Sequence, residues 1–205
     1  MAKIGVLVSG GGTNLQAIID AIANGRIDAE IGMVVSNKAG VYALERAGLR
    51  NIPTRVIDHR QYPSTVEFTR AILEVMQTSR IDLICLAGFL RIIDRLLVDA
   101  YPNRILNIHP ALLPAFGGKG MYGHYVHEAV IASGVKYSGA TVHLVTDETD
   151  VGPIIAQGIV AVEDNDTPDS LAAKVLGIEH QIYPQAIQLL LEGRIKIDGL
   201  RVRIK

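Results

Sequence analysis

Short apolar runs rich in valine and isoleucine alternate along this chain with amphipathic segments, and no other feature of the sequence restricts the fold so strongly. Strands and helices that alternate in this way are typical of βαβ units, in which right-handed helical crossovers join parallel strands. The run IDLICLAG at 81–88 is almost wholly apolar, as expected of a parallel strand buried on both faces. The sequence therefore predicts an α/β fold with a Rossmann-like, open, mainly parallel sheet and helices on both faces.

The expected elements follow from the period of the apolar residues. We expect strands at 3–9, 30–36, 53–58, 81–88, 104–109, 138–146 and 153–162. We expect helices at 15–25, 42–48, 65–80, 91–100 and 127–134.

The last third of the chain carries the strongest helix signal. Thr167 is a good N-cap and Pro168 suits the first helical position. The expected apolar stripe consists of Leu171, Val175, Ile178 and Ile182. Glu179 lies at the edge of this stripe, and Pro184 is expected to kink or end the helix. Asp198-Gly199 lies between two alternating segments and predicts a hairpin.

The size and charge of the chain favour one globular domain, 1–205. With 205 residues and a net charge of −1, the chain lacks both the basic surface of a nucleic-acid-binding protein and the composition of a disordered one. The first apolar run is too short for a signal peptide or a membrane span. The single cysteine, Cys85, is expected to be a buried packing residue. We expect a cytoplasmic protein that binds small molecules, without a nucleic-acid or membrane partner.

The segment VLVSGGGTNLQAII predicts a phosphate site between the first strand and the first helix. Three glycines, followed by Thr13 and Asn14, would let backbone N–H groups approach an anion at the start of a helix. The spacing does not match a dinucleotide-binding loop, because Leu15 stands where a glycine is expected, and no acidic residue follows the second strand. A nicotinamide oxidoreductase is therefore disfavoured. A tight turn without a ligand is the alternative.

Asn107 and His109 lie two residues apart in ILNIHPALLPAF, at the end of the fifth expected strand. Side chains alternate across a strand, so these two share a face. Ligands of open α/β sheets bind beyond the carboxyl ends of strands. An amide and an imidazole at that place can both donate to one oxygen, as a reaction through a tetrahedral oxyanion requires. The alternative is that Asn107 caps the next turn and His109 is a satisfied, half-buried side chain.

The loop TDETDVGP supplies a possible acidic partner for His109. Asp147 and Asp150 both follow a strand, and either could hold the imidazole protonated or oriented. The residues alone do not choose between the two. A metal site is not expected, because His124 and His127 lack an obvious third ligand.

Six blocks in order resemble the phosphoribosylglycinamide formyltransferases, folate-dependent enzymes of purine synthesis, over nearly the whole chain. The blocks are SGGGTNLQAI, SNK, LAGFLRII, LNIHPALLPAF, DETDVGP and EHQIYP. The fourth and fifth alone would indicate only the wider family of 10-formyltetrahydrofolate users. The resemblance implies transfer of a formyl group from 10-formyltetrahydrofolate to the amine of the glycinamide ribonucleotide, without a metal, by a monomer or homodimer.

The resemblance also implies residue roles. Asn107, His109 and Asp150 match the catalytic residues, and His143 matches a supporting histidine. The positions that match the ribonucleotide site are Gly12, Thr13, Asn14 and Glu179. Those that match the folate site are Leu90, Arg91, Ile92, Ile93, Asn107, Thr146, Asp147 and Asp150. The ribonucleotide phosphate would then belong to 1–105, and catalysis with folate binding to 106–205.

Two positions depart from the family pattern. Thr65 stands where many members carry an arginine associated with the folate tail, and Arg60 could replace it. Leu176 stands where a basic or amide side chain is common, three residues before Glu179. An additional phosphate contact from the last helix is therefore in doubt.

Rival functions differ in the features they require. A methionyl-tRNA formyltransferase would need a further basic domain, for which the chain leaves no room after Lys205, and a formyltetrahydrofolate hydrolase would need an N-terminal regulatory domain. A non-catalytic regulator that binds the ribonucleotide or folate on the same fold is the alternative from another class. The presence of all three residues Asn107, His109 and Asp150 argues against it.

Overall fold

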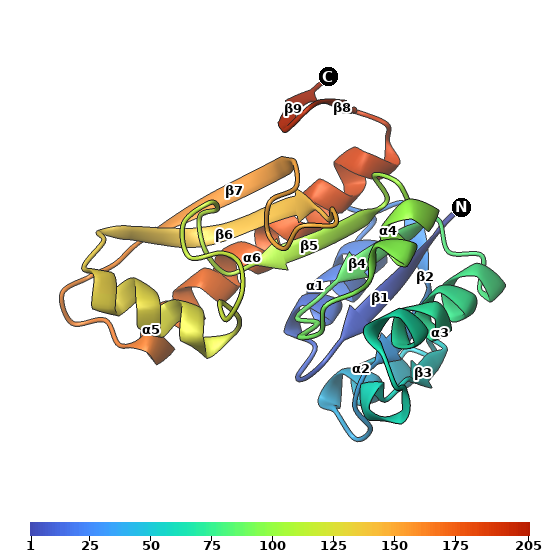
Figure 1. The fold of residues 1–205 in the computed structure, drawn as a ribbon. Helices are drawn as coiled ribbons and strands as arrows, with labels where there is room; N and C mark the ends of the chain where they lie inside the picture. The colour runs from blue at the N-terminus through green and yellow to red at the C-terminus, as the bar shows by residue number, and fades with distance from the viewer. The chain divides into compact units, whose positions relative to one another are not determined.

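The computed structural model describes all residues 1–205, which form two compact units, Met1–Asn107 and Ile108–Lys205 (Figure 1). None of its helices is both long and apolar enough to cross a membrane.

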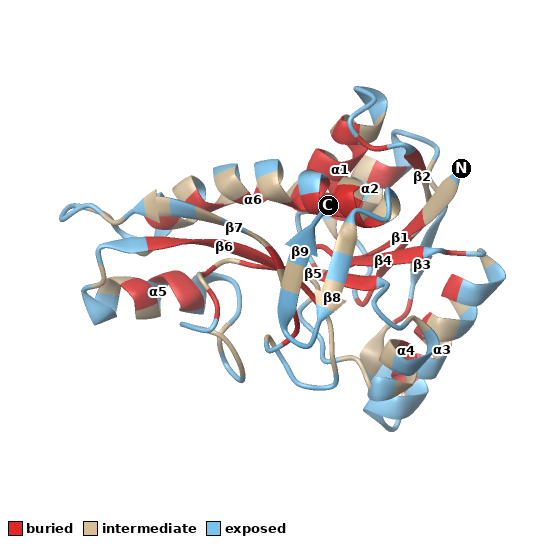
Figure 2. Ribbon diagram, turned by 90° about the horizontal axis from the view of Figure 1, so that it is seen from above, coloured by how far each residue is buried: buried red, intermediate tan, exposed pale blue.

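The first unit is a parallel sheet with helices on both faces. Its strands are β1 (Ala2–Val8), β2 (Ala29–Ser36), β3 (Thr54–Val56) and β4 (Leu83–Leu86), in the order β3-β2-β1-β4. The start of β5 (Ile105–His109) pairs in parallel with β4. The helices are α1 (Thr13–Ala23), α2 (Tyr42–Gly48), the short 3₁₀ turn His59–Gln61, α3 (Thr65–Thr78) and α4 (Arg95–Ala100). In Figure 2, α1 and α2 cover one face and α3 and α4 the other. This confirms the expected α/β architecture.

The core of this unit lies on both faces of the central strands. All four residues of β4 are buried, and Cys85 is a free, buried thiol as expected. The fourth helix starts later than the sequence suggested, at Arg95 rather than at residue 91. Asp94 is its N-cap, and the Asp94 backbone N–H is bound by the Thr69 hydroxyl. These contacts leave 89–93 outside the helix.

The second unit consists of an antiparallel strand pair with two helices and a terminal hairpin. The elements are α5 (His124–Ser133), β6 (Tyr137–Leu144), β7 (Ile154–Ala161), α6 (Pro168–Leu191), β8 (Ile195–Asp198) and β9 (Arg201–Ile204). Helix α6 packs against both β6 and β7. The expected hairpin is present, with Gly199 at a positive φ of 59° in its turn.

The start of α6 agrees with the sequence, and Leu171 and Val175 of the expected stripe are buried. Thr167 caps the helix, and its hydroxyl accepts the Ser170 N–H in a capping box. The buried residues after Val175 are Glu179, Tyr183, Ala186, Ile187, Leu189 and Leu190, together with Pro184. Ile178 and Ile182, which were expected in the stripe, are half-buried and face Gly158 of β7. The helix does not end at Pro184.

Candidate active site

The glycine loop makes the turn from β1 into α1. Gly12 is the N-cap of α1, in the left-handed conformation with φ 71°. A Cβ atom on Gly12 would lie 2.6 Å from Cβ of Ala43, so both the backbone and its surroundings require glycine here. Thr13 then begins the helix, and Asn14 is buried. The loop therefore brings backbone to the positive end of an eleven-residue helix, where an anion is favoured.

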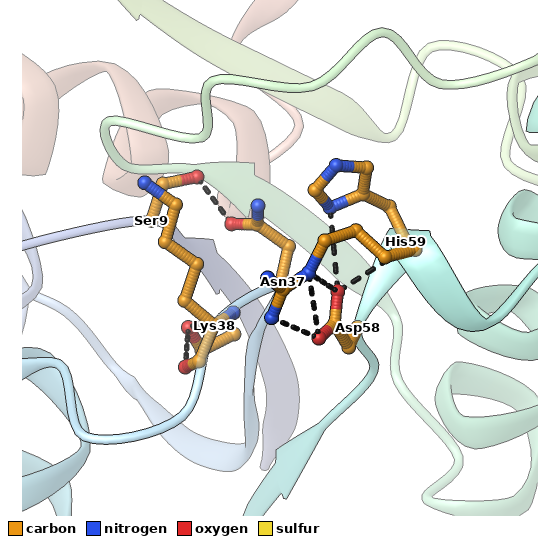
Figure 3. A network of polar contacts seen from close by, with 7 residues as sticks. Ser9, Asn37, Lys38, Asp58 and His59 are labelled. Atoms are coloured by element: carbon orange, nitrogen blue, oxygen red, sulfur yellow. Dashed lines mark hydrogen bonds and ion pairs between the residues drawn. The ribbon is translucent and has the colours of Figure 1, made fainter.

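A buried hydrogen-bond relay connects this loop with the segment after β4. The Ser9 hydroxyl donates to Oδ1 of Asn37 at 2.6 Å, and its oxygen accepts the backbone N–H of Leu90 at 2.8 Å. Figure 3 shows Ser9 and Asn37 pointing toward one another from the ends of β1 and β2. Ser9 and Asn37 are both almost fully buried. The relay thus fixes the start of 90–93 relative to the glycine loop.

The segment 90–93 presents apolar side chains to solvent. Leu90 and Ile92 are 47% and 70% exposed, which is unusual for residues of this size in a firmly anchored segment. Below them Phe89 stacks on Phe68 of α3, with ring centroids 6.4 Å apart. An exposed apolar surface on a fixed backbone suits a flat, apolar ligand.

His109 ends β5 and is 4% exposed. Its Nε2 lies 2.8 Å from the carbonyl oxygen of Phe116, which can only accept, so Nε2 carries a proton. Its Nδ1 faces Asp150 Oδ2 at 3.6 Å. Asn107, two residues earlier in the same strand, is half-buried.

Asp150 is held by a narrow loop between β6 and β7. The Leu144 N–H binds the Pro153 carbonyl at 2.9 Å, and Gly152 lies so close to Leu144 that no side chain would fit. Asp150 itself has φ 59°, a strained value for a residue with a side chain. Its Oδ2 accepts the N–H of Gly118 at 2.9 Å. The unfavourable backbone conformation of Asp150 thus orients this carboxylate.

His143 lies on the other side of the same carboxylate. Its Nε2 is 3.6 Å from Asp150 Oδ1, and its Nδ1 is 2.9 Å from the Leu144 carbonyl oxygen. Asp150 therefore faces two buried imidazoles, His109 and His143. Asp147, the other carboxylate that the sequence allowed, is exposed. The geometry selects Asp150 as the partner of His109.

The pKa values of His109 and Asp150 are set by two opposing effects, burial and the charges and hydrogen bonds of neighbouring groups. Burial lowers the pKa of His109, and the nearby Asp150 opposes that shift without cancelling it. Burial alone would raise the pKa of Asp150. The hydrogen bond to His143, the charge of His109 and the Gly118 N–H outweigh burial, so the pKa of Asp150 lies below its usual value. The carboxylate is ionised at neutral pH, and the resting state of His109 favours the neutral imidazole.

Segment 110–118 contacts His109 through the Phe116 carbonyl, and side chains of β6 and β7 hold it in place. The Thr141 hydroxyl accepts the Leu113 N–H and donates to the Ala111 carbonyl, and Gln157 donates to both Thr141 and Leu113. Sequence reasoning did not find Thr141 or Gln157. Their role depends on contacts with a loop some thirty to forty-four residues away in sequence, which no local pattern shows.

The other expected residues are placed as follows. Glu179 is buried in α6, although it was expected only at the edge of the apolar stripe. Thr146 is half-buried and donates to the Glu148 carbonyl. Thr65 opens α3. Arg60 forms an ion pair with Asp58, with Nη2 to Oδ2 at 2.7 Å, and its hydrogen bonds lower the pKa of Asp58 to about 2.

Comparison with known proteins shows the class of protein to which this fold and site belong. Residues 2–187 match the family model for formyl transferases. The chain belongs to the formyl transferase family.

Its similar relatives are phosphoribosylglycinamide formyltransferases. The chloroplastic enzyme of that name from Arabidopsis thaliana is 44% identical over 95% of this chain and 67% of its own length. The crystal structure of glycinamide ribonucleotide transformylase 1 from Symbiobacterium toebii has a TM-score of 0.95 and 46% identity, over 100% of this chain and 94% of that one. The trifunctional purine biosynthetic protein adenosine-3 of Homo sapiens is 43% identical over 96% of this chain, which spans only 19% of that protein.

Proposed function

We propose that this protein transfers the formyl group of 10-formyltetrahydrofolate to the amine of phosphoribosylglycinamide, a step of purine synthesis. The observation that carries the proposal is the buried group of His109, Asp150 and His143 in a member of the formyl transferase family. The similarity to phosphoribosylglycinamide formyltransferases along nearly the whole chain supports the choice of acceptor.

The ligand sites follow the same assignment. The ribonucleotide phosphate would bind the start of α1 at Gly12, Thr13 and Asn14, where the positive end of the helix favours an anion. Glu179 would contact the ribose. The folate would contact 90–93 together with Thr146, Asp147 and Asp150, and the exposed apolar surface of Leu90 and Ile92 supports that role.

The reaction requires a bond exchange at the formyl carbon. The amine nitrogen attacks this carbon, the carbonyl oxygen becomes an oxyanion, and the bond from carbon to folate N10 then breaks. Asn107 and His109 would donate hydrogen bonds to the oxyanion, which stabilises charge that exists only in the transition state. The proton that the amine loses ends on N10 of the leaving tetrahydrofolate, with Asp150 assisting the transfer directly or through water.

His109 has a suitable proton for this role without being charged at rest. Its Nε2–H is donated to the Phe116 carbonyl in the structure. We propose that the formyl oxygen takes the place of this carbonyl when substrate binds. A growing negative charge near the ring would then favour the imidazolium, which Asp150 would stabilise from Nδ1.

A direct assay tests the function. The purified protein, given phosphoribosylglycinamide and 10-formyltetrahydrofolate, should release tetrahydrofolate and formylated ribonucleotide in equal amounts. Ribonucleotide binding by calorimetry without any turnover would instead favour the non-catalytic regulator.

We also propose that the protein acts in the cytoplasm as a monomer or homodimer, on small molecules alone. Light scattering of the purified protein and fractionation of cells that express it test both statements. A larger assembly, or recovery with membranes, would contradict them.

A further inference from the structure

Helix α2 supports the glycine loop from the side. The Ala43 N–H binds the Gly10 carbonyl at 3.2 Å, and Ala43 lies directly against Gly12. Figure 2 shows α1 and α2 on the same face of the sheet. The loop therefore has a fixed neighbour in α2.

Arg46, one turn later in α2, makes the most extensive contact with this loop. Its Nε donates to the Gly11 carbonyl at 2.8 Å, and its Nη1 donates to Oε1 of Gln16 in α1 at 3.1 Å. Its guanidinium carbon lies 4.6 Å from the ring centre of Tyr42. These three partners are neutral groups, so none of them cancels the charge of the guanidinium.

The contacts also determine which way the loop's peptide groups point. The carbonyl of Gly10 is held by Ala43, that of Gly11 by Arg46, and that of Gly12 by the Gln16 N–H. A peptide whose carbonyl oxygen is turned toward one side presents its N–H to the other. The N–H groups of Gly11 and Gly12 are therefore turned away from α2, and that of Thr13 points out of the N-terminus of α1, which leaves them oriented for an anion.

We propose that Arg46 is a positioning residue for the ribonucleotide phosphate. It holds the Gly11 carbonyl away from the anion and places an unbalanced positive charge behind the loop. The inference rests on the proposed function, because it assigns the phosphate of the ribonucleotide to this loop. It offers a source of the phosphate affinity that Leu176 cannot supply from α6.

The main test is steady-state kinetics of Arg46→Met and Arg46→Lys. Losing a hydrogen bond from a charged donor should raise the KM for the ribonucleotide about tenfold in Arg46→Met, with kcat and the KM for the folate within about twofold of wild type. Lysine keeps the charge but lacks the fork that reaches Gly11 and Gln16 together, so Arg46→Lys should be intermediate. A wild-type KM in Arg46→Lys would overturn positioning in favour of charge alone.

Arg50 provides the matched control. It lies four residues further on, is exposed, and Arg50→Met removes the same charge. An equal rise in ribonucleotide KM in Arg50→Met, or none in Arg46→Met, would overturn the inference. If Arg46→Met does not fold, Tyr42→Leu removes the exposed ring beneath the guanidinium and should raise the same KM about threefold.

A second measurement does not depend on turnover. Calorimetric titration with inorganic phosphate should show weaker binding to Arg46→Met than to Arg50→Met by about tenfold. If wild type binds phosphate in this pattern but forms no product, the proposed function fails and this inference stands. If wild type turns over and the two variants bind phosphate equally, this inference fails and the function stands.

Discussion

At the scale of single residues, the chemistry depends on one carboxylate held between two imidazoles. Asp150 meets His109 through Oδ2 and His143 through Oδ1, at 3.6 Å in each case. The left-handed backbone of Asp150 and the Gly118 N–H keep it in this place. Losing either His109 or Asp150 leaves the remaining buried partner without its counterpart.

We expect His109→Ala to lower kcat on the order of 100-fold or more, because a donor to the oxyanion is lost. Asp150→Asn should lower kcat comparably, since an amide cannot stabilise the imidazolium. The exposed Glu148 of the same loop supplies the control, and Glu148→Gln should keep near-wild-type activity. Steady-state assays at saturating concentrations of both substrates measure kcat for each variant. Normal turnover by either of the first two variants would contradict the assigned roles.

His127 links stability to pH. It is 5% exposed, and burial, followed by the charges of His124 and His109, lowers its pKa. Below about pH 6.5 His127 binds a proton in the unfolded chain, whereas in the folded chain it stays neutral until the pH reaches its lower pKa. The free energy of unfolding should therefore fall as pH decreases through this window.

The variant His127→Gln tests this linkage. Its free energy of unfolding, measured with urea, should fall less between pH 7 and pH 5.5 than that of wild type, because the variant lacks the imidazole whose pKa is lowered by folding. His109 acts in the same direction and remains in both proteins. An equal fall in both proteins would show that His127 is not the source.

At the scale of elements, two glycines of α6 and β7 have opposite requirements. Gly158 of β7 lies against α6, and a Cβ there would come 2.2 Å from Cγ2 of Ile178. Gly177, inside α6, has open space around its Cβ position. Gly158→Ala should destabilise by about 1–3 kcal/mol through overpacking. Gly177→Ala should stabilise by about 0.5–1 kcal/mol, since alanine loses less backbone entropy in a helix. Urea unfolding measures both, and the same sign for the two would contradict the packing.

The relay of Ser9 and Asn37 also acts at this scale, because it ties the end of β1 to the segment after β4. Ser9→Ala would leave the part-buried Leu90 N–H without its acceptor and the buried Oδ1 of Asn37 without its donor, which costs about 1–3 kcal/mol. The KM for the folate should rise with it, since 90–93 loses its anchor. Ser79→Ala, at the end of α3, is the control and should change stability by less than about 0.5 kcal/mol. An unchanged stability in Ser9→Ala would show that Leu90 is held by other contacts.

Sequence patterns predicted the elements better than their surfaces. Alternation of apolar runs was sufficient for the strands, and the Thr167 cap located the start of α6. On α6 the pattern of apolar residues located Leu171 and Val175 in the core and Ile178 against β7, but it does not show that the polar Glu179 is buried as well. The late start of α4 is marked by Asp94, an N-cap in the local sequence that the apolar run 91–100 obscured. The Thr69 hydroxyl of α3, which accepts the Asp94 N–H, has no such local signal.

In the candidate site, too, local features were predicted from the sequence and tertiary contacts were not. Strand alternation placed Asn107 and His109 on one face, since that property is local. The choice of Asp150 over Asp147 depended on a backbone turn with positive φ. The roles of Thr141 and Arg46 depend on contacts between segments distant in sequence. Such contacts are set by tertiary packing and cannot be obtained from periodicity.

At the scale of the whole molecule, binding of substrates and stability of the fold are coupled. A ligand that binds only the folded chain raises its free energy of unfolding by about 2.7 kcal/mol at one hundred times its dissociation constant. For a chain of 205 residues this corresponds to a rise in melting temperature of roughly 5–10 °C. The effect requires no chemistry, so it reports the binding sites separately from catalysis.

We therefore expect phosphoribosylglycinamide alone to raise the melting temperature by this amount, and a non-reactive folate analogue to do the same. Nicotinamide adenine dinucleotide serves as the control and should have no effect, because Leu15 breaks the dinucleotide spacing and β2 ends in Ser36 and Asn37 without a carboxylate. The ribonucleotide shift should shrink in Arg46→Met and persist in His109→Ala, since the first variant weakens phosphate binding and the second removes only a donor to the oxyanion. A shift with the dinucleotide, or a ribonucleotide shift that disappears in His109→Ala but persists in Arg46→Met, would contradict the assignment of binding to the glycine loop and of chemistry to the end of β5.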